Sequence, residues 1–365
     1  MPLDLKRRTM EDKHQITWIN GAKLVAIIAV LIDHTQRVLY QNLDIAEATY
    51  FSVSLFIILS GMTSYLSDLR HDKLSGGGQN YIHKVTPLLT AYCVATAIYM
   101  IATTYEFDLA IYVSNLIHFS ATSPFYFIMV YLQLMLVNRF LFNFLQKCPN
   151  SIKGYLYEFL MMIGIIVFSG WTSNYTNILD LYGGGGKLLG GTYLIMYYLG
   201  MIFIKHGWLE KVKIVKSLFA LIVPGIVWFM LWKCVCTYGM LLDNYIPLSV
   251  SKNPPGITYM LCGVCVLFMT YGFFTLLEQI KCLKKIAQLL SEGGKHSMYI
   301  YLYHYLVYEN YLMRYMGNLP AQNIWAARIV FLLTMFFVPI LIEIFIKYIR
   351  QFFVGILRPN GQCGV

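Results

Sequence analysis

The sequence predicts an all-α, polytopic integral membrane protein of about ten transmembrane helices, with both termini in the cytoplasm. The 365 residues are 58% hydrophobic and only 13% charged, and the mean hydropathy is +0.58. Apolar runs of about 20 residues recur along the whole chain, and each is long enough to cross a bilayer. The segments between them are short. We therefore expect one polytopic membrane domain and no appended soluble domain.

The expected spans follow the apolar runs in order. The first run follows a basic, polar N-terminus and is too long for a signal-peptide core, so it counts as a span. The segment 104–123 has room for a short re-entrant or interfacial helix. Because the limits of apolar runs are uncertain by several residues, nine or eleven spans also fit. The ten spans are about 16–40, 47–68, 81–103, 124–146, 156–172, 188–205, 214–235, 257–278, 296–315 and 325–347.

The distribution of lysine and arginine sets the expected orientation. With the N-terminus inside, the cytoplasmic segments hold most of the 28 lysines and arginines, as cytoplasmic loops do. This bias predicts a cytoplasmic segment over 1–15, a transmembrane domain over 16–350 and a cytoplasmic tail over 351–365. The net charge of +10 is then a matter of topology, and no nucleic-acid partner is expected.

Two ionisable side chains inside the first span are the leading candidates for a functional site. Lys23 and His34 are eleven residues apart, so they share one helix face and lie roughly 16 Å apart along the axis. Ionisable residues are costly in a bilayer and point to function, and an imidazole suits proton transfer at neutral pH. Asp33 points about 100° away from His34, so a group from another helix is the better partner for the imidazole.

Each of these residues also has a purely structural interpretation. His34 could be hydrogen-bonded between two helices, and Lys23 lies near enough to the cytoplasmic end of its helix to reach the interface. Alternatively, Lys23 binds an anionic group, such as a phosphate, at the inner mouth of a cavity.

Further ionisable residues lie in the last two spans. His304 is inside span nine, Glu309 follows five residues later, and Glu343 lies in span ten. Residues of this kind face the bundle interior or a wet cavity. Either glutamate could orient an imidazole, and the sequence leaves open which one reaches it.

Cations gather around the start of span three, where Arg70, His83 and Lys84 lie. This pattern is typical of cytoplasmic charge bias and also of a docking site for a polyanionic cofactor. The close cysteine pairs occur in or at the ends of apolar spans without matching histidines, which favours packing over a metal site. These pairs are Cys234 with Cys236, and Cys262 with Cys265.

Seven strings, in order along nearly the whole chain, resemble acyltransferase family 3, a family of membrane proteins. The first is a basic residue, ten residues and a histidine, with Lys23 where arginine is usual. The span-three string keeps Lys84 but lacks the flanking arginines of the family. The Asp-His pair also resembles heparan-glucosaminide acetyltransferases. The strings are Trp18–Lys23 with Asp33–His34, Ser54–Gly61, His83–Pro87, Pro124–Ile128 with Gln133, Gly191–Gly200, Pro254–Pro255 with Tyr259, and Lys295–His304.

The resemblance implies transfer of an acyl group, usually acetyl, from cytosolic acyl-CoA to a hydroxyl of a cell-surface or lipid-linked glycan. It implies a multi-pass protein of the cell membrane, in contact with its lipids, that needs no metal and could form homo-oligomers. The cations Lys23, Arg70, His83 and Lys84 would hold acetyl-CoA or another short acyl-CoA. The expected catalytic set is His34 as base or nucleophile, with Asp33, His304 and Glu309 in support.

Two other functions fit the same composition. The first is a secondary transporter or flippase of a glycan precursor without acyl transfer, although no internal repeat is visible. The second is a non-catalytic membrane partner in a glycan assembly complex. The acceptor sugar, the identity of the acyl group, and the choice between direct transfer and an acyl-histidine intermediate stay open.

Overall fold

The computed structural model describes residues 3–36, 40, 42–75, 80–175, 192–209, 213–238, 254–312 and 324–357. These residues are helical apart from turns and one isolated bridge between Gln36 and Tyr40. The elements are α1 (Leu3–His34), α2 (Leu43–Thr49), α3 (Phe51–Ser75), α4 (Asn80–Thr104), α5 (Leu109–His118), η1 (Ser123–Phe125), α6 (Tyr126–Lys147), α7 (Ile152–Tyr175), α8 (Tyr193–Lys205), α9 (Ile214–Tyr238), α10 (Ile257–Gln279), α11 (Lys284–Lys295), α12 (Ser297–Val307), η5 (Tyr308–Leu312) and α14 (Ile324–Leu357).

The all-α, polytopic fold predicted from the sequence is confirmed. In the described part of the chain, eight helices are long and apolar enough to cross a membrane. The remaining two expected spans are described only in part. Span 188–205 is represented by α8, of 13 residues, and span 296–315 by α12, of 11 residues, followed by the π-helical turn η5. A bilayer core needs about 20 helical residues, so these two elements are the reason the count of ten stays a prediction.

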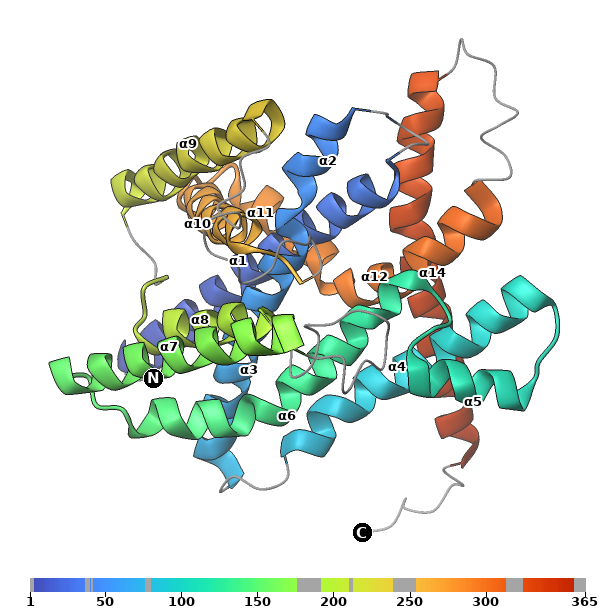
Figure 1. The fold of residues 1–365 in the computed structure, drawn as a ribbon, viewed down its shortest axis with the longest axis horizontal. Coiled ribbons are helices and arrows are strands. Elements are labelled where there is room, and N and C mark those ends of the chain that lie inside the picture. The colour runs from blue at the N-terminus through green and yellow to red at the C-terminus, as the bar shows by residue number, and fades with distance from the viewer. Residues whose placement is uncertain are drawn as a thin grey trace.

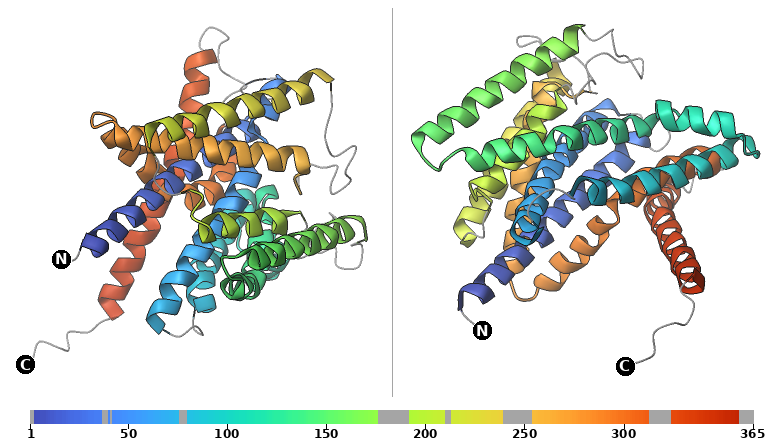
Figure 2. Two further views of the ribbon diagram at one scale, coloured as in Figure 1. Left: turned by 90° about the vertical axis from the view of Figure 1, so that its left-hand side faces the viewer. Right: turned by 90° about the horizontal axis from the view of Figure 1, so that it is seen from below.

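The central helices are α1 and α3, which run through the middle of the molecule (Figure 1). Helix α1 packs against α3, α10 and α11, and α3 packs against α8 and α10. The outer helices α7, α9 and α14 bury little of their apolar length, as expected of surfaces that face lipid. The start of α1 and the end of α14 lie on the same side of the molecule (Figure 2).

Glycines allow the closest helix contacts. A Cβ atom on Gly61 of α3 would lie 2.0 Å from the carbonyl oxygen of Tyr197, and one on Gly200 of α8 would lie 2.1 Å from that of Ile58. The two helices therefore cross backbone to backbone, as small residues permit in membranes. On α11, a Cβ atom on Gly294 would lie 1.7 Å from the carbonyl oxygen of Asn20, so α11 lies directly on α1.

The expected short helix within 104–123 is α5, which folds back along α4 (Figure 2). Asp108 caps its first turn by accepting hydrogen bonds from two backbone N–H groups, a common cap. The chain then reverses at Phe119, whose φ is 53°. The hydroxyl of Tyr92 on α4 donates to the carbonyl groups of Asn115 and Leu116 at the end of α5. This hairpin places the 3₁₀ helix η1, which precedes α6, against α12, where the hydroxyl of Tyr301 donates to the carbonyl oxygen of Pro124.

Candidate active site

The two intramembrane histidines predicted to be functional lie side by side. His34 is the last residue of α1, and His304 is in α12. Their ring centroids are 5.1 Å apart, and the ring of Tyr305 lies 5.3 Å from that of His34. His304 is completely buried, whereas His34 is partly exposed. The partner expected for His34 from another helix is therefore another histidine, together with a tyrosine.

The hydrogen bonds of His304 define which of its nitrogens carries the proton. Its Nδ1 atom lies 2.7 Å from the carbonyl oxygen of Tyr301 and 3.1 Å from that of Ile300. Because a carbonyl oxygen only accepts, Nδ1 must donate a proton. The Nε2 atom then has a free lone pair, and it is buried without a hydrogen-bond partner among the described residues. His304 thus presents a neutral imidazole with an unused proton acceptor.

Lys23 lines a cavity of about 220 Å³ between α1, α3, α4, α6 and α12. Within the described residues, its ammonium group has no hydrogen-bond or ion-pair partner, so its charge is available to a ligand. Tyr301 also lines the cavity, and its ring lies 5.8 Å from that of His304. Tyr301 thus lies between the cavity that contains Lys23 and the ring of His304. Its lining is Lys23, Phe56, Ser60, Leu88, Phe127, Ile128, Tyr131, Ser297, Met298, Tyr301 and Leu302.

The two predicted catalytic carboxylates occupy different surroundings. Glu309, in η5, is within electrostatic range of the Tyr305 hydroxyl group, and the ring of Tyr305 lies beside that of His34. Asp33 is within electrostatic range of the hydroxyl groups of Tyr40 and Tyr126. This placement fits the helix geometry, which turns Asp33 away from the adjacent imidazole.

The remaining predicted cofactor ligands are placed less directly. Lys84 forms an ion pair of 2.5 Å with the buried Asp68, although Leu88, one turn further along α4, lines the cavity. Arg70 is exposed near the end of α3, and no described contact joins it to the cavity. His83 belongs to α4, but its side chain lies outside the described residues. Among the described side chains of these four residues, Lys23 is the one that lines the cavity.

Asp68 also holds a buried polar chain that sequence reasoning missed. Asn138 donates to its carboxylate at 2.7 Å, and the hydroxyl of Tyr197 donates to the Asn138 carbonyl oxygen at 2.9 Å. This chain joins α3, α6 and α8 behind the cavity. Tyr301 was also missed, although its spacing of three residues from His304 places both on one helix face.

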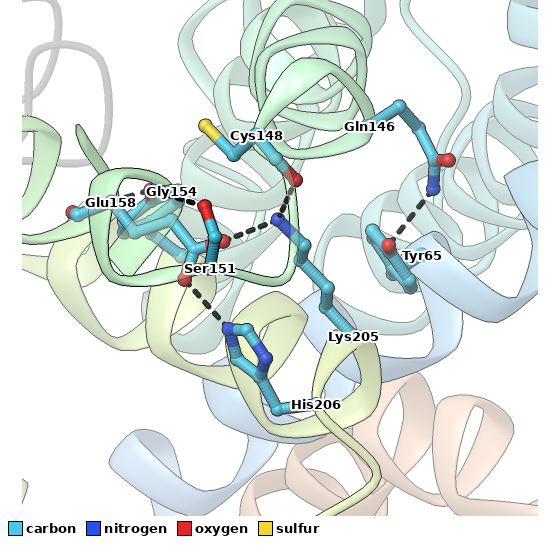
Figure 3. Close-up of polar contacts among 9 residues, drawn as sticks. Tyr65, Gln146, Cys148, Ser151, Gly154, Glu158, Lys205 and His206 are labelled. Atoms are coloured by element: carbon cyan, nitrogen blue, oxygen red, sulfur yellow. Dashed lines mark hydrogen bonds and ion pairs between the residues drawn. The ribbon is translucent and has the colours of Figure 1, made fainter. Parts of the chain in front are cut away.

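Two further clusters, also missed, each combine a buried glutamate with a lysine and a histidine. In the first, shown in Figure 3, Glu158 of α7 accepts from Lys205 and from His206, the latter at 2.6 Å. Lys205 also donates to the carbonyl oxygen of Cys148 at 2.9 Å. Burial raises the pKa of the Cys148 thiol, which makes it a poor nucleophile near neutral pH.

The second cluster belongs to the start of α12. Glu343 of α14 accepts from His296 at 2.6 Å and from Lys347 at 2.5 Å. His296 immediately precedes α12. The sequence left open whether Glu309 or Glu343 reaches an intramembrane imidazole. In the structure Glu343 binds His296 rather than His304, while Glu309 lies within electrostatic range of Tyr305.

Comparison with known proteins gives one result that covers almost the whole chain. The family described as Acyltransferase domain, acyltransferase family 3, matches residues 16–343. Searches of curated proteins and of solved structures found no match. The matched range begins at the start of the first expected span and includes every residue around the histidine pair and the cavity. The chain therefore belongs to acyltransferase family 3 and is a multi-pass membrane acyltransferase.

Proposed function

We propose that this protein transfers a short acyl group, most simply acetyl, from cytosolic acyl-CoA to a hydroxyl of a cell-surface or lipid-linked glycan. The family membership supports acyl transfer in general. The observation that supports this particular reaction is a cavity whose wall includes Lys23, which has no ion-pair partner among the described residues, with the pair of histidines beyond Tyr301. We place the enzyme in the cell membrane with both termini in the cytoplasm.

The cavity suits the arm of acyl-CoA that carries the thioester. Lys23 can attract the phosphates at the base of the arm, because an ammonium group is a strong donor to phosphate oxygens. Eleven residues of helix separate it from His34, which is roughly 16 Å along the axis. An extended pantetheine arm spans a similar distance. The thioester would then lie beside Tyr301 and the histidines.

In the proposed reaction, His34 acts as general base. It takes the proton of the acceptor hydroxyl, and the oxygen attacks the thioester carbonyl carbon. The new acyl–oxygen bond forms while the acyl–sulfur bond breaks, and the proton passes from the imidazolium to the departing CoA thiolate. The products are the acylated glycan and free CoA, so atoms and charge balance. A relay through an acyl-histidine uses the same groups in two steps.

His304 and Glu309 would stabilise the charge that His34 acquires. The lone pair on His304 Nε2 belongs to a ring whose centroid lies 5.1 Å from that of His34, so a small rotation would let it accept a hydrogen bond from the imidazolium. The carboxylate of Glu309 acts on the same ring through Tyr305. Both interactions strengthen in a water-poor site.

The direct test is acetyl transfer by purified protein in lipid nanodiscs supplied with radiolabelled acetyl-CoA. We expect the wild type to move label from CoA to a sugar acceptor, to water or to itself. His34→Ala should lower the rate about a hundredfold or more, the usual contribution of a general base. The matched control is His118→Ala, because His118 is an exposed histidine on α5 whose described hydrogen bonds stay within that helix.

The assay also separates the alternatives. Normal transfer by His34→Ala would remove that residue from the mechanism. Tight binding of CoA without turnover by the wild type indicates that the acceptor is missing from the assay. Neither binding nor turnover with any short acyl-CoA would contradict the proposal and favour transport of a glycan precursor.

A further inference from the structure

The Glu343 cluster is open to solvent on its cationic side. The carboxylate of Glu343 is 5% exposed, whereas the side chains of His296 and Lys347 are 30% and 59% exposed. The ammonium group of Lys347 carries three donors, and one of them serves Glu343. It also lies 6.0 Å from the ring centroid of Tyr299. The cluster thus presents a fixed ammonium group, an imidazole and an aromatic ring to the surface.

This cluster adjoins the cavity that contains Lys23. His296 is followed directly by Ser297 and Met298, and both of these residues line the cavity. Tyr299 is the next residue along the chain. An anionic molecule whose arm enters the cavity past Ser297 would therefore have its outer end beside Lys347 and His296.

The exposure of its basic side chains separates this cluster from the other described ion pairs. Lys84 is 17% exposed and is bound by Asp68. Lys205 and His206 are 7% and 4% exposed and point to Glu158. The exposed Lys295 is neutralised by the equally exposed Glu292 in the preceding turn. The buried carboxylate of Glu343 binds Lys347 on the protein side, and the ammonium group is exposed to solvent on its other side. This arrangement suits the binding of a phosphate.

We infer that Lys347, His296 and Tyr299 bind the phosphorylated adenosine end of the acyl-CoA donor. The ammonium and imidazole groups contact phosphate oxygens, and the tyrosine ring offers a stacking surface to the adenine. Glu343 positions Lys347 and His296 and offsets the charge of the lysine, so that CoA can leave after transfer. This inference rests on the proposed acyltransferase function and adds a second phosphate-binding point to Lys23.

The test compares two acetyl donors, acetyl-CoA and acetyl-pantetheine, which share the thioester arm but differ in the nucleotide. The protein is the full chain in nanodiscs of zwitterionic lipid. Lys347→Gln should raise KM for acetyl-CoA about threefold to tenfold, the range of one partly exposed charge contact, and leave KM for acetyl-pantetheine and kcat for both donors unchanged. His296→Gln should act in the same direction with a smaller effect.

A second variant distinguishes binding of the donor by this cluster from a purely structural role in which the cluster only holds α12 in place. Glu343→Gln removes the compensating carboxylate and keeps Lys347 and His296, so it should lower KM for acetyl-CoA about twofold or more. If the cluster only holds α12 in place, this variant would impair both donors alike. Lys216→Gln is the matched control, because Lys216 is an exposed lysine on α9, a helix that contributes no residue to the cavity lining.

Three results would overturn the inference. The first is an unchanged KM for acetyl-CoA in Lys347→Gln, and the second is an equal change for both donors. In the third, the effect of Lys347→Gln appears only when anionic lipid is added to the nanodiscs, which would assign the site to a lipid headgroup phosphate. Failure of the proposed function looks different, because the wild type itself would then transfer acetyl from neither donor.

Discussion

Glu158 and Glu343 are both buried glutamates that bind one lysine and one histidine, yet they belong to regions with different tasks. In the Glu158 cluster the cations are almost as buried as the carboxylate, whereas in the Glu343 cluster they are open to solvent. The same three residue types therefore make a closed internal crosslink in one place and an exposed cationic surface in the other. Residue type alone does not distinguish the two.

The difference follows from what each cluster joins. Glu158 connects α7 with the end of α8 and with the loop after α6, through the Cys148 carbonyl group (Figure 3). Aromatic rings of Tyr155 and Trp208 cover His206. Glu343 instead connects α14, which buries little of its length, with the residue before α12. A peripheral helix leaves one side of its cluster uncovered, and this side is adjacent to the cavity.

The largest effect on stability is expected from Glu158→Ala. The change leaves the buried ammonium group of Lys205 without its counter-charge, which costs about 3–5 kcal/mol. We expect a large fall in the unfolding temperature of the purified protein, measured by its intrinsic tryptophan fluorescence. Glu292→Ala, which breaks an exposed pair, should change the unfolding free energy by less than about 1 kcal/mol. Equal effects of the two variants would show that the Glu158 cluster is not a crosslink.

The next largest effect tests whether packing, in addition to charge, makes the region around α8 rigid. Gly200→Ala places a methyl group 2.1 Å from the backbone oxygen of Ile58, and the crossing of α3 and α8 must widen. The expected cost is about 1–3 kcal/mol, measured in the same unfolding experiment. Gly164→Ala is the control, because a Cβ atom there meets nothing within 4 Å. It should be neutral or stabilising by about 0.5–1 kcal/mol, since alanine favours the helix.

The smallest effect is the coupling between Lys347 and Glu343. A double-mutant cycle with Lys347→Gln and Glu343→Gln should give a coupling energy of about 0–1 kcal/mol in unfolding, because the lysine is 59% exposed. The corresponding cycle for Lys205 and Glu158 should give a clearly larger value. A strong coupling at Glu343 would reclassify that cluster as a second structural crosslink and weaken its role in donor binding.

The sequence predicted the helical fold and the shared helix face of Lys23 and His34 from hydrophobic length and residue spacing. Long apolar runs must form helices in a bilayer, since every backbone hydrogen bond has to be satisfied within the segment. The spacing of Lys23 and His34 predicted that they share a face, and both do face α12, one in the cavity and one beside His304. Helices α8 and α12 lie within the ranges expected for their spans, and residues 188–191 and 313–315 of those ranges lie outside the described residues.

The partners of the ionisable residues could not be read from the chain. Lys84 was expected to bind the cofactor, and its pairing with Asp68 depends on how α3 meets α4. The Glu158 cluster combines residues that are 47 and 48 positions apart. No local pattern encodes such contacts, because the register between helices is decided by packing along their whole length.

The sequence by itself therefore determined the helical membrane fold, the family and the ionisable residues that are costly in a bilayer. Hydrophobic length, the distribution of cations between segments and helical periodicity are local properties, and they can be recognised without knowledge of the neighbouring helices. The tertiary structure alone decided that His304 lies beside His34, that Glu309 lies near Tyr305, and that Glu343 binds His296 and Lys347. Each of these arrangements depends on contacts between separate helices or on the direction in which a side chain points. Those contacts also decide whether a charged group is neutralised by a partner or exposed to solvent.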